Sequence, residues 1–213
     1  MAGETMGLRE RKKLETGKRI YRTAVALFAE KGFDNVSVQE IADAAEVSKM
    51  TVFNYFGTKD DLVFRPVEDH FWDAARAVRE RGPGESAVEA VRRHFLEMVE
   101  ARDPAVGLHS EPFARQVRQL VMETPVLMER AFLAAQKGTR ALAALLAEET
   151  GDPMLATVAA AMLSAARNAL IEEHHARHDA GESLEAIAAD APERAARAFA
   201  LVEQGLGDYA RKA

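Results

Sequence analysis

The apolar positions of this chain recur at helical spacing over most of its length, and short polar or glycine-containing stretches separate the periodic segments. The first segment covers residues 14–30 and is followed by Gly32, which suits the left-handed conformation that closes a helix. Two short segments follow, at 38–45 and 49–55, and each begins after a serine that can cap it. The pattern therefore predicts one long helix and then two short helices joined by a tight turn.

More helices are expected after residue 57. Thr58 can cap a helix that runs to about residue 81, and Pro66 should kink that helix because proline lacks the amide hydrogen that bonds to the preceding turn. The remaining helices are expected at 85–101, 108–122, 125–149, 153–179 and 191–210, with a short helical turn at 183–189. No segment has the pattern of a strand, so the predicted fold class is all-α.

These helices are expected to form two domains. Residues 1–60 should form an N-terminal three-helix domain with a helix-turn-helix, in which residues 1–12 are a flexible basic arm. Residues 61–213 should form a larger helical domain. The last two long helices of that domain are rich in alanine and leucine, and such small side chains permit close packing at a bundle interface.

The composition adds limits on where the protein works. The chain has 213 residues and is 48% hydrophobic, which is enough for a packed core. No segment approaches the roughly 20 uncharged apolar residues of a membrane span, and no apolar region follows the basic N-terminus as it would in a secretory signal. Cysteine is absent, which excludes disulfides and cysteine-based zinc sites or nucleophiles. We therefore expect a cytoplasmic protein without a membrane partner.

The distribution of charge is more informative than the net charge of −6. Residues 1–59 contain ten Lys or Arg and eight Asp or Glu, giving +2, so the rest of the chain carries −8. Six of the ten basic residues lie between Arg9 and Arg19. One basic face can bind phosphates while the remaining surface is acidic, so this asymmetry is compatible with nucleic-acid binding. The basic cluster is interpreted either as a solvated tail or as an arm that becomes ordered on DNA.

The two short helices carry the pattern of a helix-turn-helix, whose second helix enters the major groove of DNA. Its exposed side chains would then meet base edges: lysine can donate to guanine, asparagine to adenine, and an apolar side chain can touch the methyl group of thymine. A lysine at the start of the next helix can bind a phosphate. The candidates are Lys49, Met50, Thr51, Asn54, Tyr55 and Lys59.

The stretch IYRTAVALFAEKGFDNVSVQEIADAAEVSKMTVFNYFGTKDDLV, Ile20 to Val63, resembles the DNA-binding region of the tetracycline-repressor (TetR) family. The resemblance covers close to a fifth of the chain and includes the positions of both helix caps and of Lys59. Together, LRERKK, FAEKGFD and AEVS are also similar to a branch of the family with acyl-CoA-like or other long apolar effectors. The rest of the chain agrees with the family only in being helical.

The resemblance implies a homodimer that binds a palindromic double-stranded DNA operator through its first three helices. A small-molecule effector would bind in the larger domain, and the last two helices would form the dimer interface. It also adds Gln39 and Ser48 to the residues expected at DNA. The family often has Gly where Glu46 stands, Gly or Pro where Met50 stands, and Tyr where Phe53 stands. Glu46 would be strained if its φ is positive.

Each candidate also has a purely structural interpretation. Phe53 and Phe56 are expected to be core residues, whereas Tyr55 can bury its ring and still offer its hydroxyl to a phosphate. His174 and His178 have the i,i+4 spacing of metal ligands, but no third ligand is fixed nearby and the surrounding stretch is polar. We therefore predict a solvated helix end there, with no metal and no cofactor.

The effector pocket has the weakest sequence signal, because each apolar candidate is equally suited to an ordinary core. A pocket for a long apolar effector would need an apolar tunnel with a basic mouth. The candidates for its lining are Trp72, Phe95, Met98, Phe113, Val117, Met122 and Phe132.

The sequence thus predicts a ligand-responsive, DNA-binding transcriptional regulator, a homodimeric repressor released from its operator by a small apolar effector. One alternative is a transcriptional activator with the same helix-turn-helix. Another is a helical protein-interaction or ligand-binding protein without specific DNA binding. No nucleophile–base pair, glycine-rich phosphate loop or metal signature supports an enzyme.

Overall fold

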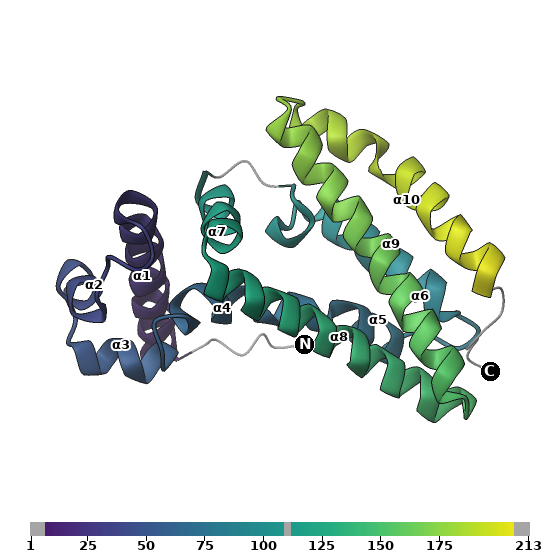
Figure 1. The fold of residues 1–213 in the computed structure, drawn as a ribbon, viewed down its shortest axis with the longest axis horizontal. Helices are drawn as coiled ribbons and strands as arrows, with labels where there is room; N and C mark the ends of the chain where they lie inside the picture. Colours follow the sequence, from purple (N-terminus) through teal and green to yellow (C-terminus); the bar gives the residue numbers. More distant parts are fainter. Residues whose placement is uncertain (1–6, 109–111, 207–213) are drawn as a thin grey trace. The chain divides into compact units, whose positions relative to one another are not determined.

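The computed structural model describes residues 7–108 and 112–206, and these residues form helices without any strand (Figure 1), which confirms the all-α fold class. The α-helices of the first half are α1 (Leu8–Lys31), α2 (Val38–Ala44), α3 (Lys49–Phe56), α4 (Asp61–Glu68), α5 (Asp73–Arg79) and α6 (Ala87–Glu100). Those of the second half are α7 (Pro112–Glu123), α8 (Pro125–Thr150), α9 (Pro153–Asp179) and α10 (Leu184–Leu206). Two 3₁₀ helices, η1 (Asp69–Trp72) and η2 (Pro104–Val106), complete the list.

The chain divides into two compact units. The first contains residues up to Val67 together with Pro112–Ala131, and the second contains Glu68 to Glu111 together with the chain from Phe132 onward. The sequence pattern did not predict that α7 belongs to the first unit. It is fixed by contacts such as the edge-to-face packing of Tyr21 and Phe113, whose ring centres lie 5.1 Å apart.

The first helix begins earlier than predicted. Residues 8–12, expected to be part of a flexible arm, form the beginning of α1. Residues 1–6 of the predicted arm lie outside the described part of the chain. Leucine, arginine, glutamate and lysine all favour helix, and a helix already nucleated by its packed part extends at little cost. The packed part of α1 begins at Ile20, which is fully buried.

The predicted helix from Thr58 to residue 81 is instead three elements, α4, η1 and α5. Pro66 lies inside α4, and the chain changes to a 3₁₀ helix three residues later. Part of α8 packs tightly here: a Cβ added to Gly138 would lie 2.0 Å from the carbonyl oxygen of Phe71. The interruption at η1 thus coincides with a close backbone contact that only glycine allows.

One helix, α10, spans residues 184–206 where two segments were predicted, and residues 207–210 of the second predicted segment lie outside the described part of the chain. α10 contains Pro192 and continues through it. Ile187, Ala191 and Ala195 are fully buried on both sides of the proline, and Phe199 continues the same stripe. Packing of this stripe against the core of the second unit compensates for the hydrogen bond that proline cannot make.

α9 is long and apolar enough to cross a membrane by length and composition alone. This helix does not meet the sequence criterion of roughly 20 uncharged apolar residues, because Arg167 interrupts its apolar run. Ala156, Ala159, Ala160 and Leu163 of this helix are fully buried in the core of the second unit. A core helix of a bundle has this same composition, so the property is weak evidence for a membrane span.

Candidate nucleic-acid interface

Two serine caps set the start of α2 and α3, as the sequence predicted. The Ser37 hydroxyl accepts a hydrogen bond from the Glu40 amide at 3.1 Å. The Ser48 hydroxyl accepts one from the Thr51 amide at 3.0 Å, and the Ser48 and Thr51 hydroxyls lie 2.7 Å apart. Ser48 thus fixes the first turn of α3, the helix expected to read DNA.

The turn between α2 and α3 is held by backbone hydrogen bonds, among them one from the Val47 amide to the Ala42 carbonyl at 3.0 Å. Glu46 occupies this turn with φ at 53°. This is the left-handed region, in which a residue with a Cβ is strained and glycine is not. The sequence-based expectation for Glu46 is therefore confirmed.

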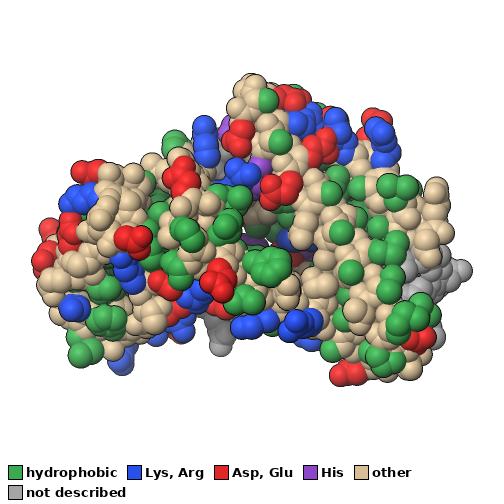
Figure 2. Space-filling model, viewed as in Figure 1, with side chains coloured by type: hydrophobic (Ala, Val, Ile, Leu, Met, Phe, Trp, Pro, Cys, Tyr) green, Lys and Arg blue, Asp and Glu red, His purple; other side chains and the backbone are tan. Residues whose placement is uncertain are grey.

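α3 has one buried side and one exposed side. Val52 and Phe56 are buried in the core of the first unit. Lys49, Met50 and Asn54 are exposed, Met50 to 67%, and Figure 2 shows basic and hydrophobic side chains together on the surface over α3. The helix therefore presents a lysine, an amide and a thioether to solvent from a rigid support.

The predicted core role of Phe53 is wrong. Its side chain is 39% exposed, and the Lys49 ammonium lies 6.0 Å from the centre of its ring. Residues 49 and 53 are one helical turn apart, so the ring lies beside the lysine on the exposed side of α3. Phe56, three residues later, takes the core position, as predicted.

Tyr55 is half-buried and lies against α1. A Cβ at Gly17 would be 3.3 Å from the Tyr55 ring, so α1 approaches the last turn of α3 closely at this point. The Arg65 guanidinium also donates a hydrogen bond to the Tyr55 carbonyl at 2.8 Å and so ties α4 to the end of α3. Sequence reasoning missed Gly17 and Arg65, because neither contact has a local signature.

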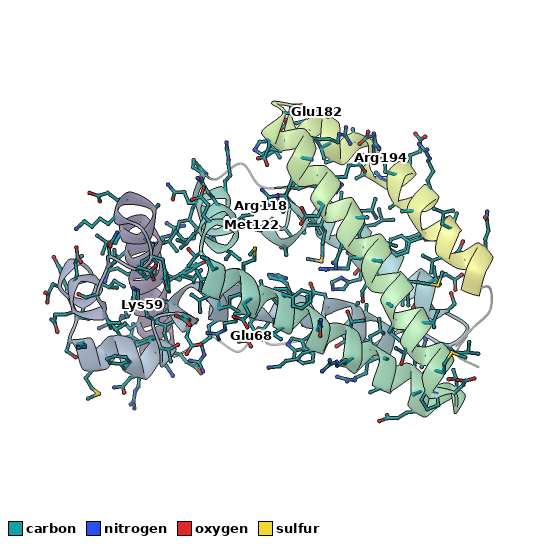
Figure 3. All side chains as sticks on the ribbon, in the orientation of Figure 1. Lys59, Glu68, Arg118, Met122, Glu182 and Arg194 are labelled. Atoms are coloured by element: carbon teal, nitrogen blue, oxygen red, sulfur yellow. The ribbon has the colours of Figure 1, made fainter. Side chains whose placement is uncertain are left out.

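Lys59 precedes α4 and lies among the helices of the first unit (Figure 3). Its ammonium is 4.4 Å from the ring centre of Phe33 and 5.7 Å from that of Phe28. Both distances are within the range of a cation–π interaction. The rings therefore hold a half-buried lysine in place at the beginning of α4, where a phosphate-binding lysine was predicted.

The start of α4 is capped reciprocally. The Thr58 amide donates to the Asp61 carboxylate at 3.0 Å, and the Asp61 amide donates to the Thr58 hydroxyl at 3.2 Å. Asp61 also forms an ion pair with Arg130 of α8. Burial alone would raise the pKa of Asp61, but the hydrogen bonds from Arg130 and Thr58 outweigh it and hold that pKa below its usual range.

Gln39 is exposed near the start of α2, and its amide donates to Asp43 at 2.8 Å. The hydroxyls of Ser48 and Thr51 are likewise engaged, in the cap described above. Of the eight residues predicted to meet DNA, these three therefore use their polar groups within the protein, whereas Lys49, Met50 and Asn54 are presented to solvent.

The seven residues predicted to line a pocket belong to both units, and their role in binding an effector stays a prediction. Val117 and Phe113 pack in the first unit, and Phe95 and Met98 are buried in the core of the second. Trp72, Met122 and Phe132 are 38%, 56% and 60% exposed. Apolar side chains serve cores and pockets alike, and their sequence pattern could not distinguish the two.

The second unit contains a buried ionic cluster around Asp73. Asp73 is fully buried and pairs with Arg76 of its own helix, with His70 at 3.3 Å and with Arg167 of α9 at 3.3 Å. Hydrogen bonding to Asp73 raises the pKa of His70, and burial lowers the pKa of the neighbouring His94. The Nε atom of Arg167 is buried without a hydrogen-bond partner.

His174 corrects the prediction of a solvated helix end. Its side chain is fully buried, and Nδ1 lies 2.7 Å from the Val106 carbonyl oxygen. A carbonyl oxygen only accepts, so Nδ1 carries the proton; burial lowers the pKa of His174 and favours the neutral ring. Within residues 7–108 and 112–206, no group of three or more His, Asp or Glu side chains is placed to hold a metal ion.

Comparison with known proteins agrees with this architecture. The profile of the bacterial regulatory proteins of the tetR family matches residues 20–65. The HTH-type transcriptional regulator TcmR of Streptomyces glaucescens is 27% identical over 68% of this chain and 65% of its own length. The chain spans less than two thirds of the length of the first curated relatives that it matches.

Solved structures show the same fold. NalD, the secondary repressor of the MexAB-OprM multidrug efflux pump in Pseudomonas aeruginosa, has a TM-score of 0.58 at 20% identity, covering 89% of this chain and 96% of NalD. A SmeT–triclosan complex has a TM-score of 0.57 at 18% identity, covering 90% and 91%. The capped helix-turn-helix lies within residues 20–65, the segment that matches the tetR family of bacterial regulatory proteins.

Proposed function

We propose that this protein is a ligand-responsive, DNA-binding transcriptional regulator of the cytoplasm. The observation that carries the proposal is the two-sided α3: Val52 and Phe56 anchor it in the core, while Lys49, Met50 and Asn54 are exposed. A helix held in this way after a tight turn is the element that helix-turn-helix proteins insert into the major groove.

The exposed side chains have distinct roles in this proposal. Lys49 donates to a guanine, Asn54 binds an adenine and Met50 contacts a thymine methyl group. Lys59, held over Phe33, binds a phosphate and fixes the register of α3 on the duplex. The base contacts of Lys49, Asn54 and Met50 determine which DNA sequence is bound, whereas the phosphate contact of Lys59 contributes to the binding of every duplex.

The finer proposal is a homodimeric repressor with a palindromic operator. The long helices α9 and α10 support the dimer, because they expose the apolar side chains of Met154, Leu155, Val158 and Leu201. Burial of these side chains against a second copy would remove them from water. The mass of the protein in solution, measured by light scattering for the unaltered chain and for Leu201→Glu, tests this interface: the substitution should yield monomers.

The effector is proposed to bind the second unit and to favour one dimer geometry over another, since a ligand shifts an equilibrium only by its differential affinity. The triclosan complex of SmeT supports a small, largely apolar molecule as the type of effector. An acyl-CoA-like compound is the narrower hypothesis from the sequence. Loss of operator binding on addition of the effector would identify a repressor of the inducible kind.

Selection of duplexes from a random-sequence pool by the purified protein tests DNA binding directly. We expect enrichment of a palindromic site. Lys49→Ala should relax the choice of base at one position of each half-site, and Lys59→Ala should weaken all duplexes alike and lower the salt slope by about one. A pool that stays random after repeated rounds, with folded protein, contradicts the proposal.

A further inference from the structure

The first turns of α1 form a basic helix outside the core. From Leu8 to Arg19 no residue is buried, and Leu8 and Leu14 are 60% and 51% exposed. This extension is about 18 Å long at the rise of an α-helix. It contains six Lys or Arg and two Glu, a net charge of +4 in a chain whose total is −6. A surface of this charge suits a polyanion.

The extension is joined to α3 by a groove of about 480 Å³ within the first unit. Gly17 lets α1 approach the Tyr55 ring, with a Cβ position 3.3 Å from it. Lys13 and Lys18 lie on either side of Gly17 along α1, and Tyr21, Phe56 and Pro66 complete an apolar floor. Glu10 also lines the groove.

We propose that this groove is a second DNA-binding surface, in which Lys13 and Lys18 hold the sugar-phosphate strand that leaves α3 at Tyr55. The inference rests on the proposed function, because it extends the same DNA interface along α1. It assigns DNA contacts to residues outside the helix-turn-helix and gives the exposed part of α1 a partner.

Two observations favour duplex DNA as the occupant. The groove is continuous with α3 through Tyr55, whose hydroxyl and ring suit a phosphate and a deoxyribose. Its two lysines outnumber the single carboxylate of Glu10, which opposes binding at one end. A phosphate strand therefore matches both the charge of the rim and the apolar floor.

The helix supplies its own matched control. At about 100° per residue, Lys12 and Arg19 lie on the side of α1 opposite Lys13 and Lys18. All four side chains are exposed, and only Lys13 and Lys18 line the groove. Lys12→Gln/Arg19→Gln therefore removes the same charge from the same helix without touching the groove, and neither pair of substitutions affects the core.

The experiment measures binding of a random-sequence duplex of about 30 base pairs over a series of salt concentrations, because non-specific binding reports phosphate contacts. Each lost phosphate contact lowers the magnitude of the slope of log affinity against log salt by about 0.9. Lys13→Gln/Lys18→Gln, which removes two contacts, should therefore lower it by about 1.8 per bound chain. Lys12→Gln/Arg19→Gln should leave the slope unchanged. Glu10→Gln should tighten binding roughly two- to fivefold. Circular dichroism confirms that each variant is folded.

Equal changes of slope in both double variants would contradict the proposal that the groove binds DNA. They would mean that the lysines act only through the overall positive charge of α1, which is the same on both sides of the helix. Unchanged slopes in both, with duplex binding by the unaltered protein, would overturn it as well. If the unaltered protein binds no duplex at any salt concentration, the proposed function itself fails, and the groove fails with it.

Discussion

The buried cluster around Asp73 yields the strongest prediction about stability. Asp73→Asn removes a carboxylate that is fully buried and pairs with Arg167, whose side chain is 11% exposed. The other partners, Arg76 and His70, have side chains 44% and 36% exposed and can turn to solvent. The substitution therefore leaves Arg167 as a buried charge without its partner.

The expected cost follows from that burial. Removing one partner of a buried ion pair costs about 3–5 kcal/mol of unfolding free energy, because the remaining charge keeps its desolvation penalty. Removing an exposed partner costs about 1 kcal/mol or less, so Arg76→Gln is the matched control. Replacing both buried partners, in Asp73→Asn/Arg167→Met, should recover much of the loss because no charge is left buried.

Urea unfolding followed by tryptophan fluorescence is the assay. Trp72, the one tryptophan of the chain, directly precedes Asp73 in the second unit. A loss for Asp73→Asn no larger than that for Arg76→Gln would refute the reasoning. So would a double variant as unstable as Asp73→Asn alone, because the cost would then not come from the unpaired Arg167.

The same cluster predicts a pH dependence. Burial alone would raise the pKa of Asp73, but His70 and Arg167 outweigh it and hold that pKa below its usual range. Its stabilisation is complete above the unfolded pKa of about 4 and is lost as the pH falls through the folded pKa. His70, with a raised pKa, stabilises fully below about 6.5 and loses its contribution as the pH rises through its folded pKa. In Asp73→Asn, the free energy of unfolding should therefore change less with pH, both in the acidic range where Asp73 titrates and in the range where His70 titrates.

Three further substitutions test local geometry by urea unfolding. Ser48→Ala removes the acceptor for the Thr51 amide and should cost about 1 kcal/mol; an unchanged midpoint would mean that the cap is not needed. Glu46→Gly should gain about 0.5–1 kcal/mol, since the left-handed cost exceeds the extra backbone entropy of glycine, and Glu46→Ala should gain nothing. Gly138→Ala should cost about 3 kcal/mol, because its Cβ would meet the Phe71 carbonyl oxygen at 2.0 Å; a neutral effect would contradict the close contact.

Local sequence signals predicted the helix-turn-helix well. The caps at Ser37 and Ser48, the strained Glu46 and the buried Phe56 follow from rules that act within one or two turns. The sequence-based interpretation places Phe53 in the core because it lacks the tyrosine hydroxyl that could contact a phosphate, but its position at the flank of the buried side of α3 leaves it 39% exposed.

Contacts between distant segments were beyond the sequence pattern. The fit of Gly17 against Tyr55 and the pairing of Asp73 with Arg167 join residues far apart in the chain. The polar stretch around His174 suggested solvent, but the helix turns that side chain toward Val106. The pocket candidates are divided between the two units for the same reason, because hydrophobicity identifies buried positions without specifying which core they enter.

The central claim is that α3 reads DNA sequence. It is tested most directly by comparing the affinity of the unaltered protein and of Lys49→Ala for a selected operator duplex and for a scrambled duplex of equal length. The account predicts that the substitution lowers affinity for the operator by about 1–3 kcal/mol and changes affinity for the scrambled duplex much less. Equal losses on both duplexes, or none on either, would contradict it.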